Sequence, residues 1–343
     1  MYSKLILLFF CILVTLLDGG TPLEYGLSLS GGYDNNVMRF SKNEIREASN
    51  DVSLMGGSNT FDSFVTKLRL FAEKSFFNTS SRSAKVNMFF TISDYNNIPE
   101  KKYWSGGLDF SYRWGSYRNI KYTLRHLDQF YLRHYVDRDI SRSALAPCKF
   151  TDRNQAITLT HRLSKLIWMN VGSGYLQRYY SKPFTEFDLD IFYIRGKINY
   201  RLKNIGSIAF QVDGGRASNI SYVPELRPSS FDRSYHSLEW YLPFKINKNL
   251  KFFNEIGISA RLESRQYDAE SSNDPLHAGR SHLDSKYDFW IKKNISDNLI
   301  LTLSSRFRTR VTDSEFTWVN DLKSFKQIQF WFNIEWDTIY DKY

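Results

Sequence analysis

The amino-acid sequence predicts an all-β protein, a single antiparallel transmembrane β-barrel of about 14 strands. Three observations predict this fold. Most of the chain after residue 20 alternates between apolar and polar residues with a period of two, which is the side-chain period of a β-strand. The polar links between these segments alternate between short and long. Aromatic residues, which favour strands, make up 17% of the chain, and there are only 8 prolines.

The N-terminus has the order of a secretory signal peptide. Lys4 precedes an apolar run from Leu5 to Leu17, and the polar and small residues 18–20 follow it. This run of about thirteen residues is shorter than the roughly twenty that a membrane-spanning helix needs. We therefore expect residues 1–20 to be a cleaved signal peptide and residues 21–343 to form the barrel. An uncleaved anchor is the alternative interpretation.

Cysteine usage excludes several chemistries. Cys11 lies behind Phe9 and Phe10, whereas a lipoprotein site needs small residues before its cysteine. Without the leader, Cys148 is the one cysteine left, so the exported chain has no intrachain disulfide. No cysteines and histidines stand at metal-ligand spacing, and no glycine-rich phosphate loop occurs. We expect neither a structural metal nor a cofactor.

The alternating segments are the predicted strands. In the clearest one, Ala84, Val86, Met88, Phe90 and Ile92 face lipid, while Lys85, Asn87, Phe89, Thr91 and Ser93 face the inside. The predicted segments are Tyr25–Tyr33, Phe64–Glu73, Ala84–Ser93, Leu108–Trp114, Ile120–Tyr135, Gln155–Leu163, Ile167–Tyr179, Phe187–Tyr200, Ile205–Asp213, Tyr235–Leu242, Leu250–Glu263, Leu283–Lys292, Leu299–Arg310 and Phe325–Trp336. The phase slips near Asp128 and near Arg195 and Gly196, where a β-bulge or a misplaced strand end would explain it.

The connections predict the orientation. Short links fall at 78–82, 115–119, 164–165, 201–204, 247–249 and 294–298. Longer links fall at 34–62, 96–105, 136–154, 181–185, 214–232, 264–281 and 312–324. Outer-membrane barrels have short periplasmic turns and long extracellular loops. We therefore expect the short links and both chain ends on the periplasmic side.

Tryptophans support this arrangement. Trp114, Trp168, Trp290 and Trp336 fall near the short links, and Trp104 and Trp318 fall near the long ones. Two interfacial girdles would have this distribution. A soluble barrel or sandwich is the alternative, because strands in general are rich in aromatics. It leaves no second set of apolar residues to fill its interior, and the inward residues are too charged for a dry core.

The stretch from Ser30 to Phe40, Ser-Gly-Gly-Tyr-Asp-Asn-Asn-Val-Met-Arg-Phe, resembles the opening of bacterial outer-membrane barrels of the porin-2 type. The resemblance implies export, barrel assembly and solute passage. Physically, the Asp and Asn residues suit the turn by which the first strand enters its outer loop. No functional residue is transferred from this resemblance.

The last strand resembles the signal that the barrel-assembly machinery reads. Ile328, Phe330, Phe332, Ile334 and Trp336 share one register, and Tyr343 falls out of phase, which indicates a short tail after the strand. We expect the assembly machinery, periplasmic chaperones, outer-membrane lipid and lipopolysaccharide as partners, and no nucleic acid.

Catalysis is the minority hypothesis. His134 stands near Asp137, Arg138 and Asp139, and a His–Asp pair can orient an imidazole as a general base. His282 and Asp284 are two apart on one predicted strand face. Both groups also suit solvated loop or wall positions, and no serine or cysteine nucleophile has a recognisable context. We expect the chain not to be an enzyme.

The charge predicts an effect on ions. The formal net charge is +10 and the pI is about 9.3. The candidate pore-lining residues are Lys67, Arg69, Lys85, Arg113, Lys121, Arg125, Arg162, Glu239, Glu255, Arg261, Asp284, Arg306, Arg308 and Arg310. Further inward carboxylates are Glu73, Asp109, Asp188, Asp190, Glu263, Asp288 and Glu335.

A small excess of basic residues over carboxylates favours anions. Two other interpretations stay open. Opposite charges can pair across the wall, and loop cations such as Lys101, Lys102, Arg138 and Arg142 can bind lipopolysaccharide.

The sequence therefore predicts a passive or weakly anion-selective outer-membrane channel for small solutes. A non-conducting surface-binding or structural barrel is the alternative, and a barrel-rim hydrolase comes third. The first long link, roughly 29 residues, is long enough to fold inward as a plug.

Overall fold

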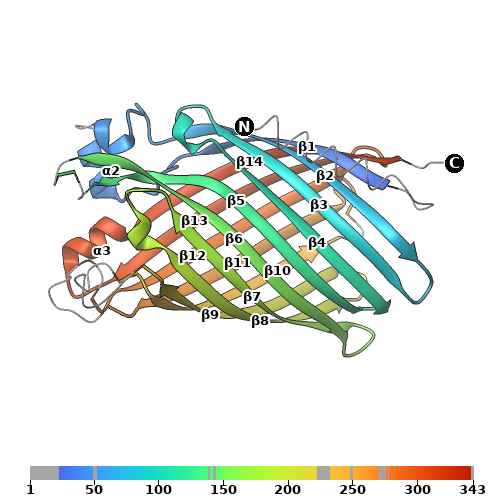
Figure 1. The fold of residues 1–343 in the computed structure, drawn as a ribbon. Coiled ribbons are helices and arrows are strands. Elements are labelled where there is room, and N and C mark those ends of the chain that lie inside the picture. The colour runs from blue at the N-terminus through green and yellow to red at the C-terminus, as the bar shows by residue number, and fades with distance from the viewer. Residues whose placement is uncertain are drawn as a thin grey trace.

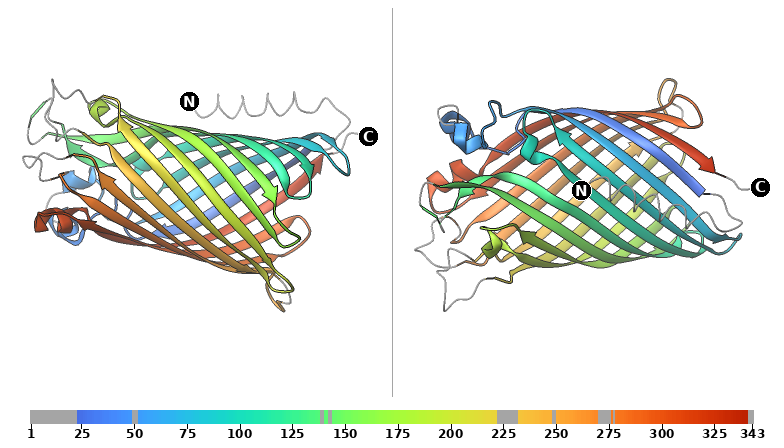
Figure 2. Two further views of the ribbon diagram at one scale, coloured as in Figure 1. Left: turned by 90° about the horizontal axis from the view of Figure 1, so that it is seen from below. Right: turned by 45° about the horizontal axis from the view of Figure 1, so that its top comes forward.

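The protein is a closed barrel of fourteen antiparallel strands, seen here in a computed structural model (Figures 1 and 2). The structure describes residues 23–48, 52–137, 140–141, 144–221, 232–247, 250–269, 276 and 278–340. Each strand pairs with its neighbours in the chain, and β1 pairs with β14 from Leu23↔Tyr340 to Asp34↔Gln329. The predicted fold class is confirmed. The predicted signal peptide lies outside the described residues.

The strands are strongly tilted (Figure 1) and are longer than the predicted segments in most cases. Their bounds are β1 Leu23–Asp34, β2 Ser63–Asn78, β3 Ser83–Tyr95, β4 Tyr103–Gly115, β5 Arg118–Val136, β6 Leu145–Arg162 and β7 Ile167–Tyr180. The second half holds β8 Leu189–Leu202, β9 Gly206–Asn219, β10 Tyr235–Ile246, β11 Glu255–Tyr267, β12 Ser281–Asn294, β13 Leu299–Asp313 and β14 Phe325–Tyr340.

Long and short links alternate over most of the barrel, but the predicted short link 247–249 extends over residues 247–254 and is as long as the link 181–188 of the long series. The helices α2 (Lys42–Ala48) and α3 (Thr317–Lys323) and the 3₁₀ turns η1 (Val52–Met55), η2 (Pro99–Lys101) and η3 (Thr185–Phe187) all lie in long links. Figure 1 shows α2 and α3 at one end of the barrel, while β1 starts and β14 ends at the opposite end. No described helix has the length and apolar character needed to cross a membrane.

The predicted link 136–154 is wrong. β6 begins at Leu145, and its first residues pair with the end of β5 up to Val136↔Leu145. Pro147 and the charged residues after it resemble a loop in sequence, but Cys148 and Phe150 are buried where β6 extends along the end of β5. β11 deviates the other way and begins at Glu255, five residues after the predicted start at Leu250.

One of the two phase slips is a bulge. The β5–β6 register shifts between Leu127 and Phe130, and Gln129 has a φ of 49°. The ladder through Arg195 and Gly196 is unbroken on both sides. That apparent slip arises because β8 starts at Leu189 and Asp190 belongs to the outer face, two residues before the exposed Phe192.

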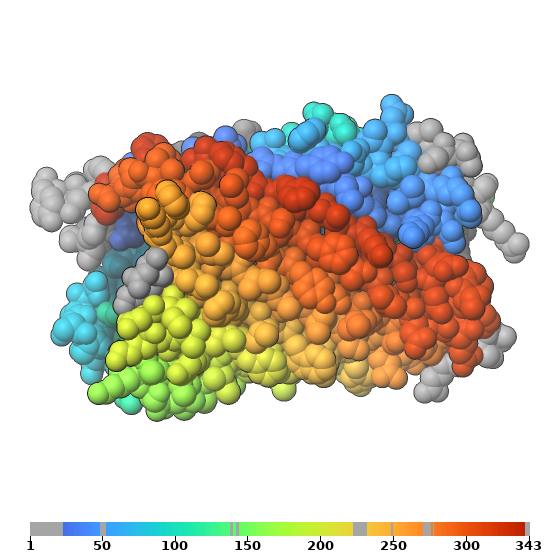
Figure 3. Space-filling view, turned by 180° about the vertical axis from the view of Figure 1, so that it is seen from behind, coloured from blue at the N-terminus to red at the C-terminus, as the bar shows by residue number. Residues whose placement is uncertain are grey.

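The outer wall is apolar. Ile194 is 59% exposed, and the alternate residues along the strands repeat this pattern around the barrel. Figure 3 shows the side chains of the later strands running in diagonal bands across one side of the wall.

Tryptophans form only part of the predicted girdles. Trp114 and Trp336 are exposed on the outside near the short turns. Trp290 donates to Glu255 Oε1 at 2.8 Å, and Trp168 stands opposite Asn199, so both face inward.

The inside–outside assignment predicts opposite outcomes for two neighbouring arginine substitutions. Phe110, 44% exposed in the middle of β4, faces outward, so Phe110→Arg should destabilise the barrel by about 2 to 4 kcal/mol. Asn87 stands opposite both Glu73 and Asp109 on the inner face, so Asn87→Arg should be tolerated. Denaturant titration of the lipid-refolded barrel measures both. Equal losses at the two sites would contradict the assignment.

Candidate functional site

The inner wall is lined with ion pairs. Besides the pairs of Asp284, candidate pore-lining residues occur in five of them: Lys85 with Glu73 (2.8 Å), Arg125 with Asp109 (2.7 Å), Lys245 with Glu255 (3.0 Å), Arg261 with Glu239 (3.3 Å) and Arg306 with Asp288 (2.6 Å). Each pair joins adjacent or nearby strands, which is the pairing that the sequence left open as an alternative. For these residues the positive charge is largely compensated.

Three inward arginines of β13, Arg306, Arg308 and Arg310, form a ladder at a spacing of two residues, and Arg306 is paired with Asp288. Arg308 donates to both Asp284 oxygens at 2.8 and 2.5 Å, and Arg310 donates to Oδ2 at 2.8 Å. Asp284 is only 1% exposed. One carboxylate therefore serves two guanidinium groups, so the loop end of the ladder retains a surplus positive charge.

Five other candidates have no carboxylate within ion-pair distance among the described residues. Lys67 lies over the Trp331 ring at 3.9 Å and Arg69 over Phe89 at 4.5 Å. Lys121 stands opposite Ser111 and Thr158 in the strand register. Near the short turns, Arg113 donates to Asn78 and Arg162 donates to the Ser164 carbonyl. These cations supply the inner positive excess.

Two predicted inward carboxylates lie elsewhere. Asp190 accepts from the Tyr175 hydroxyl at 2.6 Å on the outer face. Asp188 precedes β8 and accepts from the Tyr180 backbone N–H at 2.6 Å. The misplaced start of β8 explains both errors.

The first long link folds into the loop-side mouth of the barrel. Val37, Met38 and Phe40 of this loop form a buried cluster with wall residues, among them Tyr95 and Tyr131. The sequence left inward folding of this link open. The packing of α2 and η1 residues against the same cluster holds the loop at the mouth.

The opening motif fastens this loop to the closing strand. β1 ends at Asp34, as the motif predicted. The Asp34 carboxylate accepts from Gln327 at 2.8 and 2.9 Å and from Gln329 at 2.6 Å. Asn36 donates to the carbonyls of Phe40 and Lys326 and accepts from the Phe40 N–H. The acidic and amide side chains of the motif thus bridge β1, the loop and β14.

Two cations, from the β3–β4 link and from β5, clamp the loop. Arg133 at the end of β5 pairs with Glu44 at 2.5 Å and donates to the carbonyls of Met38 and Arg39. Lys101 of η2 donates to the Val37 carbonyl at 3.0 Å and is only 3% exposed. The sequence left open that Lys101 binds lipopolysaccharide as a loop cation, and its burial does not fit that interpretation. Lys102 is exposed and pairs with Asp94.

The charged residues at the loop-side mouth form a group that we call the mouth cluster. Its members are the cations Arg39, Lys101, Arg133, Arg308 and Arg310 and the carboxylates Asp34, Glu44 and Asp284. Burial and the nearby Arg39 lower the pKa of Lys101 to about 7. Burial, with Arg308 and Arg310 close by, lowers the pKa of Arg39 to about 9. The sequence did not indicate Arg39 or Arg133, because their meeting depends on how the loop docks.

Among the described residues, His134 does not pair with Asp137, and His282 does not pair with Asp284. His134 bonds to the Tyr131 hydroxyl at 2.7 Å, while Arg138 and Asp139 lie outside the described residues. His282 bonds to Thr312 at 2.8 Å, and Asp284 is occupied by two arginines. Cys148 is buried. Within the part of the chain that the structure describes, no group of three or more His, Cys, Asp or Glu residues is placed to hold a metal ion.

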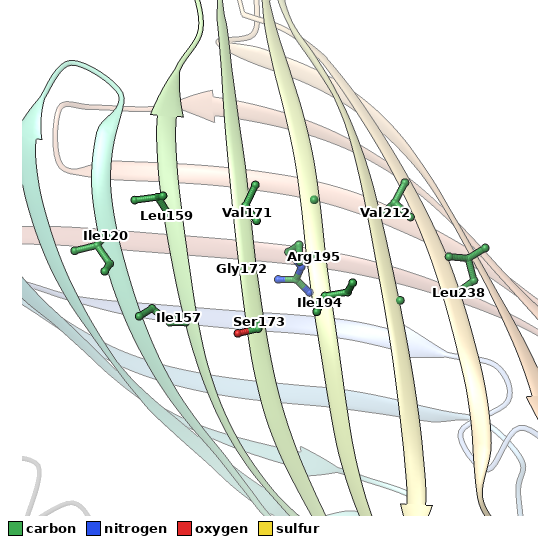
Figure 4. A pocket seen from close by; sticks show the side chains of 12 residues that line it. Ile120, Ile157, Leu159, Val171, Gly172, Ser173, Ile194, Arg195, Val212 and Leu238 are labelled. Carbon is green, nitrogen blue, oxygen red and sulfur yellow. The ribbon is translucent and has the colours of Figure 1, made fainter.

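A shallow apolar groove crosses the outer wall over β5 to β10 (Figure 4). Ile157, Leu159, Val171, Ile194 and Leu238 surround it, and the outward-facing Gly196 and Gly214 on the adjacent strands β8 and β9 leave it hollow. It faces the lipid side of the wall and contains no constellation of polar groups. We assign it to the membrane contact surface.

No family model and no curated protein matches this chain. Among solved structures, it is similar to a loop-deletion variant of OmpT, an outer membrane protein of Vibrio cholerae, at a TM-score of 0.48 and 6% identity over 93% of this chain and 100% of that one. It is also similar to Acinetobacter baumannii OccAB3 (TM-score 0.43, 8% identity, 93% and 99% covered). An anion-selective porin from Comamonas acidovorans gives a TM-score of 0.42 at 7% identity, with 93% and 100% covered. These scores are low, so the fold assignment rests on this chain's own closed strand ladder.

Loop docking depends on Arg133, which can be tested by proteolysis. Arg133→Gln removes the ion pair with Glu44, and the loss of at least about 1.5 kcal/mol should raise the open fraction of the loop about tenfold. Trypsin should then cut faster at the exposed Lys42 and Arg46 in the folded barrel. Arg118→Gln, at the short-turn end, serves as the control. Unchanged cleavage in Arg133→Gln would show that the clamp does not hold the loop.

Proposed function

We propose that the protein is an outer-membrane channel for small solutes with a preference for anions. One observation carries this proposal: ionised side chains line the inner face of the closed barrel along its length. Arg125 with Asp109, Arg195 with Asp213 and Arg261 with Glu239 are examples from different sectors of the wall. Charges in a dry interior cost several kcal/mol each, so such a wall favours a water-filled lumen.

The outer-membrane location follows from the outer face and the strand ends. An apolar band with aromatic residues near its edges suits lipid, and closure leaves no unpaired strand edge. The predicted signal peptide and the register of β14 support export and recognition by the assembly machinery and periplasmic chaperones. Lipopolysaccharide and outer-membrane lipid are the proposed surroundings. The motif from Gly32 to Val37 supports the porin-2 type within this proposal.

The anion preference rests on the inner cations that lack a partner. Lys67, Arg69 and Lys121 lie along the predicted solute path without a carboxylate in ion-pair distance among the described residues, and two positive charges in the mouth cluster are in excess. Charged walls with low-dielectric surroundings raise the local concentration of counter-ions. The preference is moderate, because most other wall charges are paired.

A non-conducting barrel is the second candidate. The docked first loop and the paired wall charges favour it, since both would suit a rigid structural or surface-binding barrel. The hydrolase hypothesis has no such observation in its favour.

Conductance distinguishes the two candidates. In a planar bilayer with a salt gradient, the purified protein should conduct with a reversal potential on the anion side of zero. Lys67→Gln combined with Lys121→Gln should move this potential toward zero, because both remove unpaired inner cations. Asp109→Asn, which frees Arg125, should move it further toward anions. All shifts should shrink in about 1 M salt, where the screening length is about 3 Å. A folded protein without conductance would support the structural barrel, and cation selectivity would overturn the anion assignment.

A further inference from the structure

The charge balance of the mouth cluster is unusual for a buried site. Its five cations face three carboxylates, and Lys323, close to Arg133 and Glu44, adds a further cation, so positive charge is in excess when all groups are ionised. Glu44 and Asp284 are already engaged by Arg133, Arg308 and Arg310. Asp34 is engaged by the neutral amides of Gln327 and Gln329. Burying unbalanced charge costs free energy unless a counter-ion is present.

Arg39 is the least satisfied member of the cluster. Its Nε is buried and has no hydrogen-bond partner, and no described carboxylate lies within ion-pair distance of its guanidinium. Its backbone has a φ of 56°, which is uncommon for a residue with a side chain. The turn closed by Asn36 and Phe40 imposes this conformation. The unpaired guanidinium of Arg39 thus lies near Arg308 and Arg310, and the backbone conformation that holds it there costs free energy.

We propose that the mouth cluster is a binding site for a doubly charged oxyanion, such as a phosphate or a small dicarboxylate. Guanidinium groups match the oxygen geometry of phosphate and carboxylate through paired N–H donors. Two negative charges on one ligand offset this positive excess. The anion therefore lies between Arg39, Lys101 and the Arg308–Arg310 pair, and the docked loop is part of the site.

The inference deepens the proposed channel function and rests on it for its role in solute passage. In that role the site would concentrate divalent oxyanions at the entrance of the lumen. Equilibrium binding, however, needs only the folded barrel with its docked loop. A binding test and a conductance test can therefore fail independently.

Isothermal titration of the detergent-folded barrel at pH 7 and low salt provides the direct test. The probes are sulfate, inorganic phosphate and succinate, with chloride as the monovalent control. Arg39→Gln and Lys101→Gln each remove one surplus charge without breaking an ion pair between described residues. Each should weaken binding about tenfold, the effect of losing one charge-assisted hydrogen bond. Arg118→Gln removes a charge at the opposite end and should bind like the original protein.

Proton uptake gives a second readout that a purely structural effect would not change. The groups around Lys101 are Arg39 and Asp34 at the first loop, Arg133 on β5, Arg308 on β13 and the rings of Tyr95 and Phe130. Because the pKa of Lys101 is about 7, the side chain is partly neutral at pH 7, and a bound anion favours its charged form. Sulfate stays doubly charged near neutral pH, so titrations in buffers of different ionisation enthalpy should reveal proton uptake. Lys101→Gln should abolish it.

The outcomes separate clearly. Saturable binding of at least one divalent probe, tighter than chloride and weakened by both substitutions, supports the site, and the tighter of phosphate and succinate assigns the ligand class. The site is overturned if the divalent probes bind no more tightly than chloride. It is also overturned if Arg39→Gln and Lys101→Gln bind the probes as the original protein does while their first loop keeps its protection from trypsin. A silent bilayer with intact divalent binding would overturn the channel and leave the binding site standing.

Discussion

Closure of the strand ladder is the constraint on which the rest of the structure depends. Inside a lipid bilayer every backbone N–H and C=O needs a partner within the protein, and an open sheet leaves one row unpaired at each edge. Pairing of β1 with β14 removes both edges. Once the sheet is closed, the two-residue side-chain period sends one set of residues to lipid and the other to the enclosed space. The charged residues of this chain therefore collect inside.

Electrostatics then divides the interior into two regions. Along the wall, cations and carboxylates pair between strands, as Arg125 and Asp109 do, and these pairs keep the net field small. At the loop-side mouth, the docked first loop adds Arg39 while the carboxylates there are already engaged. The surplus charge is therefore local, and it depends on tertiary docking rather than on the composition of any one strand.

Sequence periodicity predicts much of the fold because it depends on a local property, the alternation of side chains between the two faces of a strand. Alternation placed Lys85, Arg125 and Glu239 on the inner face. Link lengths placed the start of β1 and the end of β14 at the short-turn end of the barrel. Errors arise where local pattern and pairing disagree. Pro147 and its charged neighbours read as a loop, yet they extend β6 because β5 offers a strand edge. Trp290 reads as an interfacial residue, yet the register turns it toward Glu255.

The candidate site was less predictable than the wall. Arg308 meets Asp284 across 24 positions of sequence, and Arg133 meets Glu44 across 89, so neither partner is visible from spacing. The long first link and its Asp and Asn residues were visible, and the bridge from Asp34 to Gln327 gives that motif its physical role. What the sequence lacks is the register that brings distant charges together.

The central claim is that the inner face borders water that is continuous with the loop side and richer in anions than in cations. A cysteine at Ser111, on the inner face between Lys85 and Lys121, tests it directly. The buried Cys148 provides a background that should stay unmodified in the folded barrel. In reconstituted protein, anionic thiol reagents added from the loop side should modify Ser111→Cys severalfold faster than cationic reagents of equal size. Protection of this cysteine from both reagents, or faster reaction with the cationic one, would contradict the account.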